Sequence, residues 1–376
     1  MASPASLPPW ITPAWLRKVR SKIVPWFADN GRSLPWRSTQ DPYAIWISEI
    51  MLQQTQVATV IPYYARFLTR FPDIETLAQA DESDVLRHWE GLGYYRRARQ
   101  MHAAAQRIQS HHQGSFPRDF DSILNLPGIG RYTAGAIASF AYDDPQPIVE
   151  ANTQRLYARL CLWDQPLAMP ESQKILWEFA SAIVQPGPAG QINQSLMELG
   201  ATVCTPKQPS CNQCPLKSLC PTFKEGSQEK IPAPKPAKIY QSKTDVVLLF
   251  QNRQKRWLVR KCRDGEHWAG LWDFPRFDMT HASEPSLSQA IDDACRQRFG
   301  RGCQLGAVLG SFKHGVTKYR ITLHCHHATW IPNSKLSKTD EEVQWLTLEE
   351  LSSVALSSTG RKIWQLLMKT NSKRTL

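Results

Sequence analysis

Four cysteines crowded into one short stretch constrain this chain more than any other feature. Cys204, Cys211, Cys214 and Cys220 follow the spacing C-x6-C-x2-C-x5-C. The chain has nine cysteines in all, an odd number, so their clustering favours a metal site in a reducing compartment over a framework of disulfides. A structural zinc site more often has two short C-x2-C pairs, and this stretch has one. Spacing alone leaves zinc open beside an iron–sulfur cluster.

The length and charge of the chain narrow its class. Its 376 residues are more than one domain usually needs, and they carry a formal net charge of +12. That charge favours a polyanionic partner such as nucleic acid, because bound Lys and Arg release counterions from phosphates. No apolar run approaches the ~18–20 residues of a membrane span, and the N-terminus lacks the apolar segment of a secretion signal. We therefore expect an intracellular protein, in the cytoplasm or nucleoid if it is bacterial, with no membrane partner.

The spacing of apolar residues changes along the chain, from a helical pattern to short β-rich runs, and this change predicts two domains. From Trp15 to about Arg159 the apolar residues recur at helical spacing, and the cysteine stretch follows, so residues 1–225 are predicted to form a helical domain. Alternating prolines at 231–238 favour extended geometry, which predicts a linker over residues 226–243. Residues 244–376 are predicted to form a smaller α+β domain, because they contain short β-rich runs at 246–250, 257–259 and 319–323.

A short glycine-containing turn leads into a predicted helix. The stretch LPGIG at residues 126–130 contains Gly128 and Gly130, where the backbone can turn sharply and approach a partner closely. The small residues that follow, at 131–140, predict a helix. Backbone N–H groups at such a helix start bind anions, so this turn is predicted to bind a DNA phosphate. A plain helix–turn–helix corner has the same local pattern.

The cysteine spacing, the glycine turn and the stretch WISEIMLQQTQV at residues 46–57 resemble the helix–hairpin–helix superfamily of endonuclease III-like and MutY-type adenine DNA glycosylases. The resemblance covers nearly the whole chain. It implies an all-α glycosylase domain whose four cysteines hold a 4Fe–4S cluster, followed by an α+β Nudix-like domain. Bifunctional members carry a lysine two residues after the second glycine, which forms a Schiff base with the sugar. Here that residue is Tyr132, which cannot form an imine, so the resemblance implies a monofunctional glycosylase.

Glu49 is the first candidate catalytic residue. If its stretch is helical, Ile45, Trp46 and Leu52 are its neighbours at i−4, i−3 and i+3. Such neighbours exclude water and raise the pKa of a carboxyl, so that it keeps a proton to donate. A surface glutamate at the edge of an apolar stripe is the structural alternative. By resemblance, Glu49 is the general acid that protonates adenine at N7 so that the base leaves neutral.

Glu150 is the second candidate and departs from the family pattern. The family motif is Asp-Gly-Asn-Val, whereas this chain has EANT at residues 150–153, so glutamate stands in place of aspartate. Its carboxylate must fold back or sit deeper if it is to stabilise the sugar cation or trap it covalently. Asn152 matches the motif and is expected to orient the carboxylate or water. Tyr132 is expected to hydrogen-bond near the same carboxylate.

The resemblance also assigns residues to DNA and base recognition. Removing a base from duplex DNA requires flipping it out and filling the gap. Aromatics alternate with arginines in GLGYYRRAR at residues 91–99, which suits intercalation and phosphate contact. The assigned residues are Gln54 and Thr55 as probes of the helix, Leu92 and Tyr94 as the wedge, Arg32, Leu34 and Trp36 as the lining of the adenine pocket, and Gln194 as the reader of the base.

The C-terminal region resembles Nudix hydrolases but lacks their metal-binding glutamates. The stretch WAGLWDFP at residues 268–275 resembles the segment before the Nudix helix, yet the region expected to hold Mg²⁺ offers only Asp292 and Asp293. This domain should bind rather than hydrolyse. In MutY-type enzymes a Phe-Ser-His loop recognises 8-oxoguanine on the opposite strand, and here Val316, Thr317 and Lys318 replace it. We expect a preference for this lesion that survives but is weaker than is typical.

These features predict a monomeric adenine DNA glycosylase of base-excision repair, which acts on duplex DNA with adenine opposite 8-oxoguanine or guanine. Three alternatives remain. Tyr132 and the extra domain disfavour an endonuclease III-like lyase, and the missing glutamates disfavour a Nudix hydrolase. A lesion-binding protein with impaired catalysis is motivated by Glu150 and the altered loop, whereas Glu49, Tyr132 and Asn152 argue against it.

Overall fold

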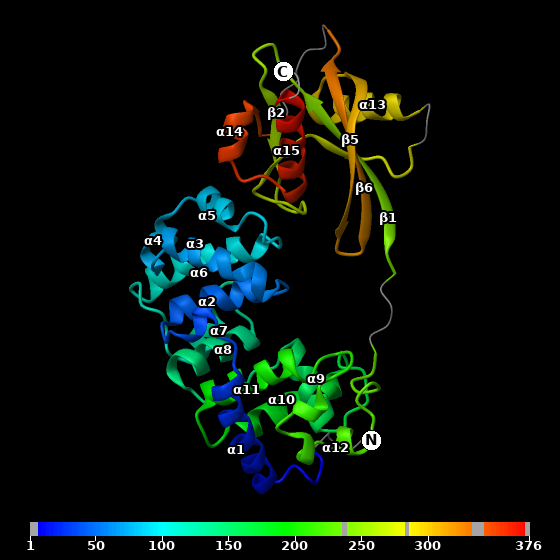
Figure 1. Ribbon diagram of the computed structural model, residues 1–376. Helices are drawn as coiled ribbons and strands as arrows, with labels where there is room; N and C mark the ends of the chain where they lie inside the picture. The colour runs from blue at the N-terminus through cyan, green and yellow to red at the C-terminus, as the bar shows by residue number, and fades with distance from the viewer. Residues whose placement is uncertain (1–6, 235–238, 283–285, 333–341, 373–376) are drawn as a thin grey trace. The chain divides into compact units, whose positions relative to one another are not determined.

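The computed structural model describes residues 7–234, 239–282, 286–332 and 342–372. The chain falls into two compact units, one formed by Met1–Gln79 and Gln100–Pro236 and the other by Ala80–Arg99 and Ala237–Leu376 (Figure 1). This division differs from the predicted boundary, because residues 80–99 group with the C-terminal unit. Within that unit Glu90 forms an ion pair with Arg361, and Arg99 forms one with Asp264.

The first unit is built from helices, several of which begin at side-chain caps. Thr12 accepts a hydrogen bond from Trp15 N at the start of α1, and Asp41 accepts from Tyr43 N at the start of α2. No helix among the described residues is both long and apolar enough to cross a membrane. The elements are α1 (Pro13–Asn30), η1 (Pro35–Arg37), α2 (Pro42–Leu52), α3 (Val57–Arg70), α4 (Ile74–Gln79), α6 (Arg96–His111, which begins in the second unit), α7 (Phe120–Leu124), α8 (Arg131–Tyr142), α9 (Ala151–Leu160), α10 (Pro170–Val184), α11 (Ala189–Thr202), η2 (Cys211–Gln213), η3 (Lys217–Leu219) and α12 (Pro221–Lys224).

The predicted helix after the glycine turn is confirmed, whereas the stretch at 46–57 is not one helix. α8 covers all of residues 131–140. α2 ends at Leu52 and α3 begins at Val57, and between them Gln54 adopts a φ of 58°. Because the helix breaks here, Thr55 and Gln56 lie at the wall of a pocket that Glu49 of α2 also lines.

Two glycines fix the position of α11. A Cβ atom at Gly190 would lie 2.5 Å from the carbonyl oxygen of Ser139 in α8. One at Gly200 would lie 2.8 Å from the carbonyl oxygen of Asn152 in α9. Because glycine has no Cβ, α11 can pack closely on both helices, and α1, α9, α10 and α11 share one buried core. This packing brings α11 to the same pocket.

The second unit contains two sheets, with strand orders β4-β1-β6-β5 and β3-β2-β7. Successive residues of β1 point to opposite faces. Val247 and Leu249 pack in a core with α14 and α15, and Val246 and Leu248 pack in a core with α13 (Figure 1). The predicted α+β class is thus confirmed. The elements are α5 (Glu82–Trp89), β1 (Gln241–Phe250), β2 (Trp257–Lys261), β3 (Trp272–Asp273), β4 (Arg276–Asp278), α13 (Leu287–Phe299), β5 (Cys303–Val316), β6 (Tyr319–Trp330), β7 (Val343–Leu346), α14 (Leu348–Ser353) and α15 (Ser358–Ser372).

The three predicted strands lie within β1, β2 and β6. The predicted linker is too long at its C-terminal end, because β1 begins at Gln241 and residues 241–243 already pair with residues 319–321 of β6. Residues 235–238 of that linker lie outside the described residues.

Candidate active site

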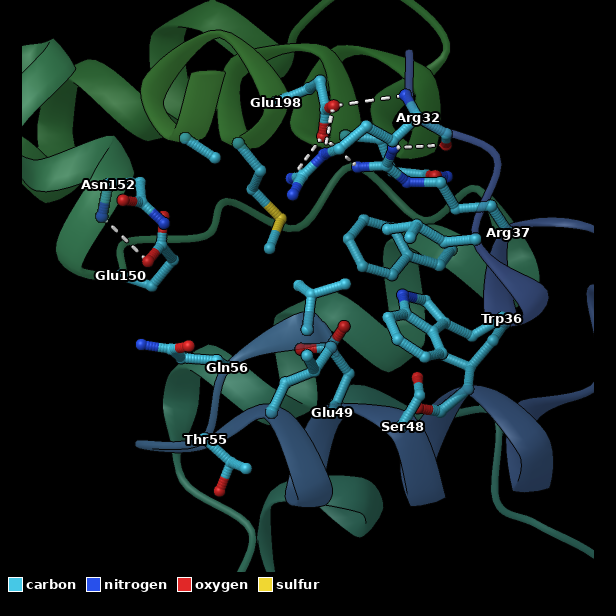
Figure 2. A pocket seen from close by; sticks show the side chains of 18 of the residues that line it. Arg32, Trp36, Arg37, Ser48, Glu49, Thr55, Gln56, Glu150, Asn152 and Glu198 are labelled. Atoms are coloured by element: carbon cyan, nitrogen blue, oxygen red, sulfur yellow. Dashed lines mark hydrogen bonds and ion pairs between the residues drawn. The ribbon is translucent and has the colours of Figure 1, made fainter. Parts of the chain in front are cut away.

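Elements far apart in the sequence of the first unit surround a pocket of about 310 Å³. In Figure 2, Glu49 rises from α2 toward this space, Glu150 and Asn152 lie on one side of it, and Trp36 and Arg37 lie on the other. A pocket of this size suits a small ligand such as a flipped base. Of the predicted residues it brings together Arg32, Leu34, Trp36, Glu49, Thr55, Tyr132, Glu150, Asn152 and Gln194.

Glu49 is buried in the most apolar helix of the pocket wall. Nine of the eleven residues of α2 are buried, and Glu49 itself is 3% exposed. Burial raises the pKa of Glu49 to about 7; the hydrogen bond from Tyr132 and the charge of Arg37 oppose the rise, and the charge of Glu150 adds to it. A large fraction of the carboxyl therefore stays protonated at neutral pH, as a general acid requires.

Tyr132 contacts a different carboxyl from the one expected. Its hydroxyl donates a hydrogen bond of 2.6 Å to Oε2 of Glu49, so the prediction that it would bond near Glu150 is wrong. The reason is positional: Tyr132 is the second residue of α8, which packs against α2. Burial raises the pKa of Tyr132 well above its usual value, so the phenol remains a donor throughout the neutral range.

The carboxylate of Glu150 caps α9. Its two oxygens accept hydrogen bonds of 2.8 Å from the backbone N–H groups of Asn152 and Thr153. The Thr153 hydroxyl in return accepts one of 2.8 Å from Glu150 N. The longer side chain thus folds back onto the helix start, the first of the two arrangements expected. Burial raises the pKa of Glu150 and the two backbone N–H groups oppose that rise.

Asn152 is held in place by an arginine to which the sequence did not point. Asn152 Oδ1 accepts a hydrogen bond of 3.0 Å from Arg155 Nη2. The same guanidinium donates to the carbonyl oxygens of Gly200 and Cys204 over 2.6 and 2.7 Å. Arg155 therefore fixes the orientation of the Asn152 amide and joins it to the first residue of the cysteine stretch. Its sequence signal was weak, an arginine two residues after the motif.

Glu198 is a second pocket residue that the sequence analysis missed. Its buried carboxylate accepts hydrogen bonds from Arg32 Nε over 2.6 Å and from Arg37 Nη2 over 2.8 Å. Burial opposes the charge, but these two arginines outweigh it and lower the pKa of Glu198. The predicted pocket residue Arg32 is thus fixed by a carboxylate of α11. The available signal was LMELGA at residues 196–201, a single acidic residue in an apolar helical stretch.

The predicted wedge residues differ from each other in exposure. Tyr94 is 57% exposed and adopts a φ of 50°, so its ring is placed to reach a partner. Leu92 is buried, and a role in filling a DNA gap would require it to move. Gln54 is exposed on the turn between α2 and α3.

The glycine turn has the geometry that its sequence predicts. Gly128 adopts a φ of 75°, and a Cβ there would lie 2.7 Å from Cβ of Gln100. Gly130 precedes α8 and offers no side-chain cap. The first N–H groups of α8 therefore have no side-chain acceptor from this residue, which suits them to bind a phosphate oxygen.

The four predicted ligand cysteines line one hollow beside α9. All four thiols are unpaired and half-buried. Among the described residues, no three His, Cys, Asp or Glu side chains are grouped so as to hold a metal ion. The donors nevertheless fit a thiolate-bound cluster, because Cys204 Sγ accepts a hydrogen bond of 3.2 Å from the buried cation Arg159, and such N–H···S bonds stabilise ligand thiolates.

The loop predicted to recognise the lesion is a tight hairpin. Val316 ends β5 and pairs with Tyr319 of β6, so Thr317 and Lys318 form a two-residue turn. Thr317 adopts a φ of 52°, which is strained for a β-branched residue. Both turn residues are exposed, and Val316 is half-buried.

In the helix expected to resemble the Nudix helix, Asp292 and Asp293 both accept hydrogen bonds from side chains of the same helix. Oδ1 of Asp292 accepts a hydrogen bond of 2.8 Å from Cys303 N, and Oδ2 accepts one of 2.9 Å from Arg296 Nε.

Known proteins resemble the chain over most of its length. Residues 47–181 match the HhH-GPD superfamily base excision DNA repair protein, and residues 246–366 match the NUDIX domain. An adenine DNA glycosylase of Buchnera aphidicola subsp. Schizaphis graminum is 39% identical over 257 residues, which cover 68% of this chain and 74% of that protein. One from Buchnera aphidicola subsp. Baizongia pistaciae is 33% identical, covering 93% of this chain and 96% of that one. The chain belongs to the adenine DNA glycosylase family.

This membership confirms the predicted family and fold class. The adenine DNA glycosylase of Mus musculus is 31% identical over 92% of this chain and 77% of its own length. A solved structure of a thermostable thymine-DNA glycosylase matches 56% of this chain and 98% of its own, with 28% identity and a TM-score of 0.51. The chain is thus a helix–hairpin–helix DNA glycosylase followed by a Nudix-like domain.

Proposed function

We propose that this glycosylase hydrolyses the N-glycosidic bond of adenine in duplex DNA, opposite 8-oxoguanine or guanine, and leaves the DNA strand intact. The observation that carries the proposal is the placement of Glu49, a carboxyl whose pKa is raised to about 7 inside a pocket of about 310 Å³ that Glu150 also lines. The relatives named adenine DNA glycosylase support adenine as the base.

Glu49 and Glu150 have different roles in the proposed reaction. Tyr132 occupies Oε2 of Glu49, which leaves Oε1 to carry the proton. Glu49 protonates the flipped adenine, the bond between the sugar C1′ and the base breaks, and its electron pair leaves with the base. Glu150 stabilises the positive charge that develops on the sugar. Water then adds to C1′ and gives up a proton to a carboxylate.

The pocket supports hydrolysis without strand cleavage. A lyase needs an amine to form an imine with the sugar, and no lysine is among the described residues that line the pocket. The position that carries this lysine in bifunctional relatives is Tyr132, whose hydroxyl is already bonded to Glu49.

We propose that Cys204, Cys211, Cys214 and Cys220 hold a 4Fe–4S cluster. When bound, the cluster would cross-link residues 204–220 through its thiolate bonds. Arg155 donates to the Cys204 carbonyl oxygen, so this stretch supports the helix that carries Asn152. Iron and acid-labile sulfide analysis of the purified protein tests the assignment, and zinc in their place would contradict it.

The Nudix-like unit is proposed to recognise the base opposite adenine. Its exposed turn keeps the hydroxyl of Thr317, which can meet the altered N7–H of 8-oxoguanine, while Lys318 favours phosphate. Exposed Tyr94 is the candidate wedge. We further propose that the enzyme acts as a monomer inside the cell, where chromosomal DNA lies and thiols stay reduced.

A lesion-binding protein without catalysis is the second candidate. It is favoured by one observation: both oxygens of Glu150 accept backbone N–H bonds, which weakens their interaction with a sugar cation. A single-turnover assay on A:8-oxoguanine duplex decides between the two. Breaks that appear only after alkali, fastest opposite 8-oxoguanine and slowest in an A:T control, establish the glycosylase. Tight binding without adenine release establishes the binding protein.

A further inference from the structure

Arg159 is a buried arginine that the proposed reaction does not use. It lies in α9, one turn after Arg155, and is 2% exposed. Its guanidinium donates over 3.2 Å to Cys204 Sγ and over 2.9 Å to the Thr205 carbonyl oxygen. On its other side it donates over 2.8 Å to the carbonyl oxygen of Gln228 and over 2.9 Å to that of Ile231. One side chain thus joins the cysteine stretch to the first residues of the predicted linker.

The charge of Arg159 requires an anionic partner. A buried guanidinium surrounded by neutral carbonyl groups is costly unless a negative charge lies nearby. Among the described residues, no carboxylate forms an ion pair with Arg159, and its one potentially anionic hydrogen-bond acceptor is the Cys204 sulfur. Cys204 supplies this negative charge when it binds a metal cluster, because a cysteine that binds a metal does so as the thiolate.

On the linker side, Arg159 contacts residues 227–231, which are fixed to the first unit and are called the anchor below. Ile231 is buried in the core of α1, α9, α10 and α11. Its N–H donates to the Ser227 carbonyl oxygen over 3.1 Å, so the segment turns before it leaves the unit. Thr222 Oγ1 also donates to the Arg159 carbonyl oxygen over 2.6 Å. The point at which the chain departs toward the second unit is set by contacts that meet at Arg159.

We propose that Arg159 is a positioning residue that couples binding of the cluster by Cys204 to the start of the interdomain linker. This inference rests on the proposed cluster. With the cluster bound, the thiolate holds Arg159, and Arg159 holds Gln228 and Ile231. When the cluster is lost, Arg159 loses its counter-charge and the anchor opens. Arg155 has a different role from Arg159, because it donates to the Cys204 carbonyl oxygen and to Asn152 at the pocket.

Limited trypsin digestion of the full-length, iron-loaded protein tests the coupling. Cleavage after exposed Lys230, next to buried Ile231, reports opening of the anchor, and cleavage after exposed Lys255 in the second unit is the internal control. At equal iron content, R159Q should be cut after Lys230 at least about tenfold faster than wild type, because local opening sets the rate. R159K, which keeps the charge, should lie between them, and R155Q should be cut as slowly as wild type. Equal cleavage of R159Q and wild type would overturn the coupling.

Two further measurements separate this role from general support of the fold. Removal of the cluster from wild type by oxidation and chelation should accelerate cleavage after Lys230 and leave cleavage after Lys255 unchanged. Unchanged cleavage after Lys230 would overturn the proposal even if R159Q fails to load iron. Loss of the N–H···S bond should also lower the reduction potential of the cluster in R159Q and leave it unchanged in R155Q. A wild-type protein without iron would instead refute the cluster itself.

Discussion

The hydroxyl of Tyr132 donates a hydrogen bond of 2.6 Å to Oε2 of Glu49. The helix that follows the glycine turn therefore directly contacts the carboxyl that we propose as the proton donor. Because Tyr132 is the second residue of α8, a displacement of that helix start would move the phenol relative to the Glu49 carboxyl. The hydrogen bond of Tyr132 thus links the predicted phosphate-binding site at the start of α8 to the Glu49 carboxyl.

The first prediction concerns pH. Glu49 must be protonated to act as the acid, and its pKa is raised to about 7 by burial. The single-turnover rate should therefore fall about tenfold for each pH unit above that value. E49Q should lose at least about 10² of the rate and show no such decline. A wild-type rate that stays constant from pH 7 to 9 would exclude Glu49 as the acid.

Y132F should shift this alkaline decline. The hydrogen bond from Tyr132 lowers the pKa of Glu49, since it stabilises the carboxylate. Its loss should move the decline upward by about one pH unit. Paired pH–rate profiles of Y132F and wild type measure the shift. A decline at lower pH would mean that the phenol stabilises the protonated acid instead. Y157F, altered at a buried tyrosine that does not line the pocket, is the control.

Substitutions at Glu150 separate its charge from its length. E150Q retains an acceptor for the cap but loses the charge that stabilises the sugar cation, so the rate should fall by at least about 10². E150D retains both the charge and a good N-cap residue, so the fold should remain intact. Because aspartate is the family residue here, E150D should react at least as fast as wild type. Chemical quench of single-turnover reactions measures both variants, with melting temperature as the control for folding. An E150Q rate equal to wild type would remove Glu150 from the mechanism.

Much of the fold was predictable because its signals are local. Apolar spacing predicts helices, and the short β-rich run at residues 246–250 predicts a strand. The grouping of residues 80–99 with the C-terminal unit was not predictable, because it depends on ion pairs such as Glu90 with Arg361, which are 271 residues apart. No periodicity in the sequence encodes such a pair.

The site was predictable where a motif carries the residue, as with Glu49 and Asn152. Residues that act by holding another side chain in place could not be predicted from the sequence. Arg155 and Glu198 belong to no motif, and their roles arise from the packing of α11 on α8 and α9, which Gly190 and Gly200 allow. The partner of Tyr132 was mistaken for the same reason, since the choice between two nearby carboxyls depends on the packing of α8 on α2.

Glu198 should matter for stability as well as for the pocket. E198Q leaves Arg32 and Arg37 without a buried anion, which should lower the free energy of unfolding by about 3 kcal/mol. E342Q, which breaks the exposed pair with Lys261, should cost less than about 1 kcal/mol. Because the pKa of Glu198 is lowered in the folded protein, its contribution is complete above the ordinary value of 4.5. It should disappear as the pH falls through the lowered pKa. Urea unfolding at pH 7 and at a series of pH values below 4.5 measures both effects, and equal costs for the two variants at pH 7 would refute the buried role.

The last prediction concerns the choice of opposite base. Thr317 keeps a hydroxyl on the turn, whereas Val316 and Lys318 lack the aromatic ring and imidazole of the family loop. The ratio of single-turnover rates for A:8-oxoguanine and A:G should therefore exceed one in wild type and rise several-fold in V316F/T317S/K318H. T317V should reduce the ratio toward one, because it removes the hydroxyl but preserves the β-branched shape. None of these changes should alter the rate on A:G, since the turn lies in the second unit and the catalytic carboxyls lie in the first. If T317V leaves the ratio unchanged, recognition of the lesion does not pass through this turn, and exposed Tyr94 becomes the residue to test.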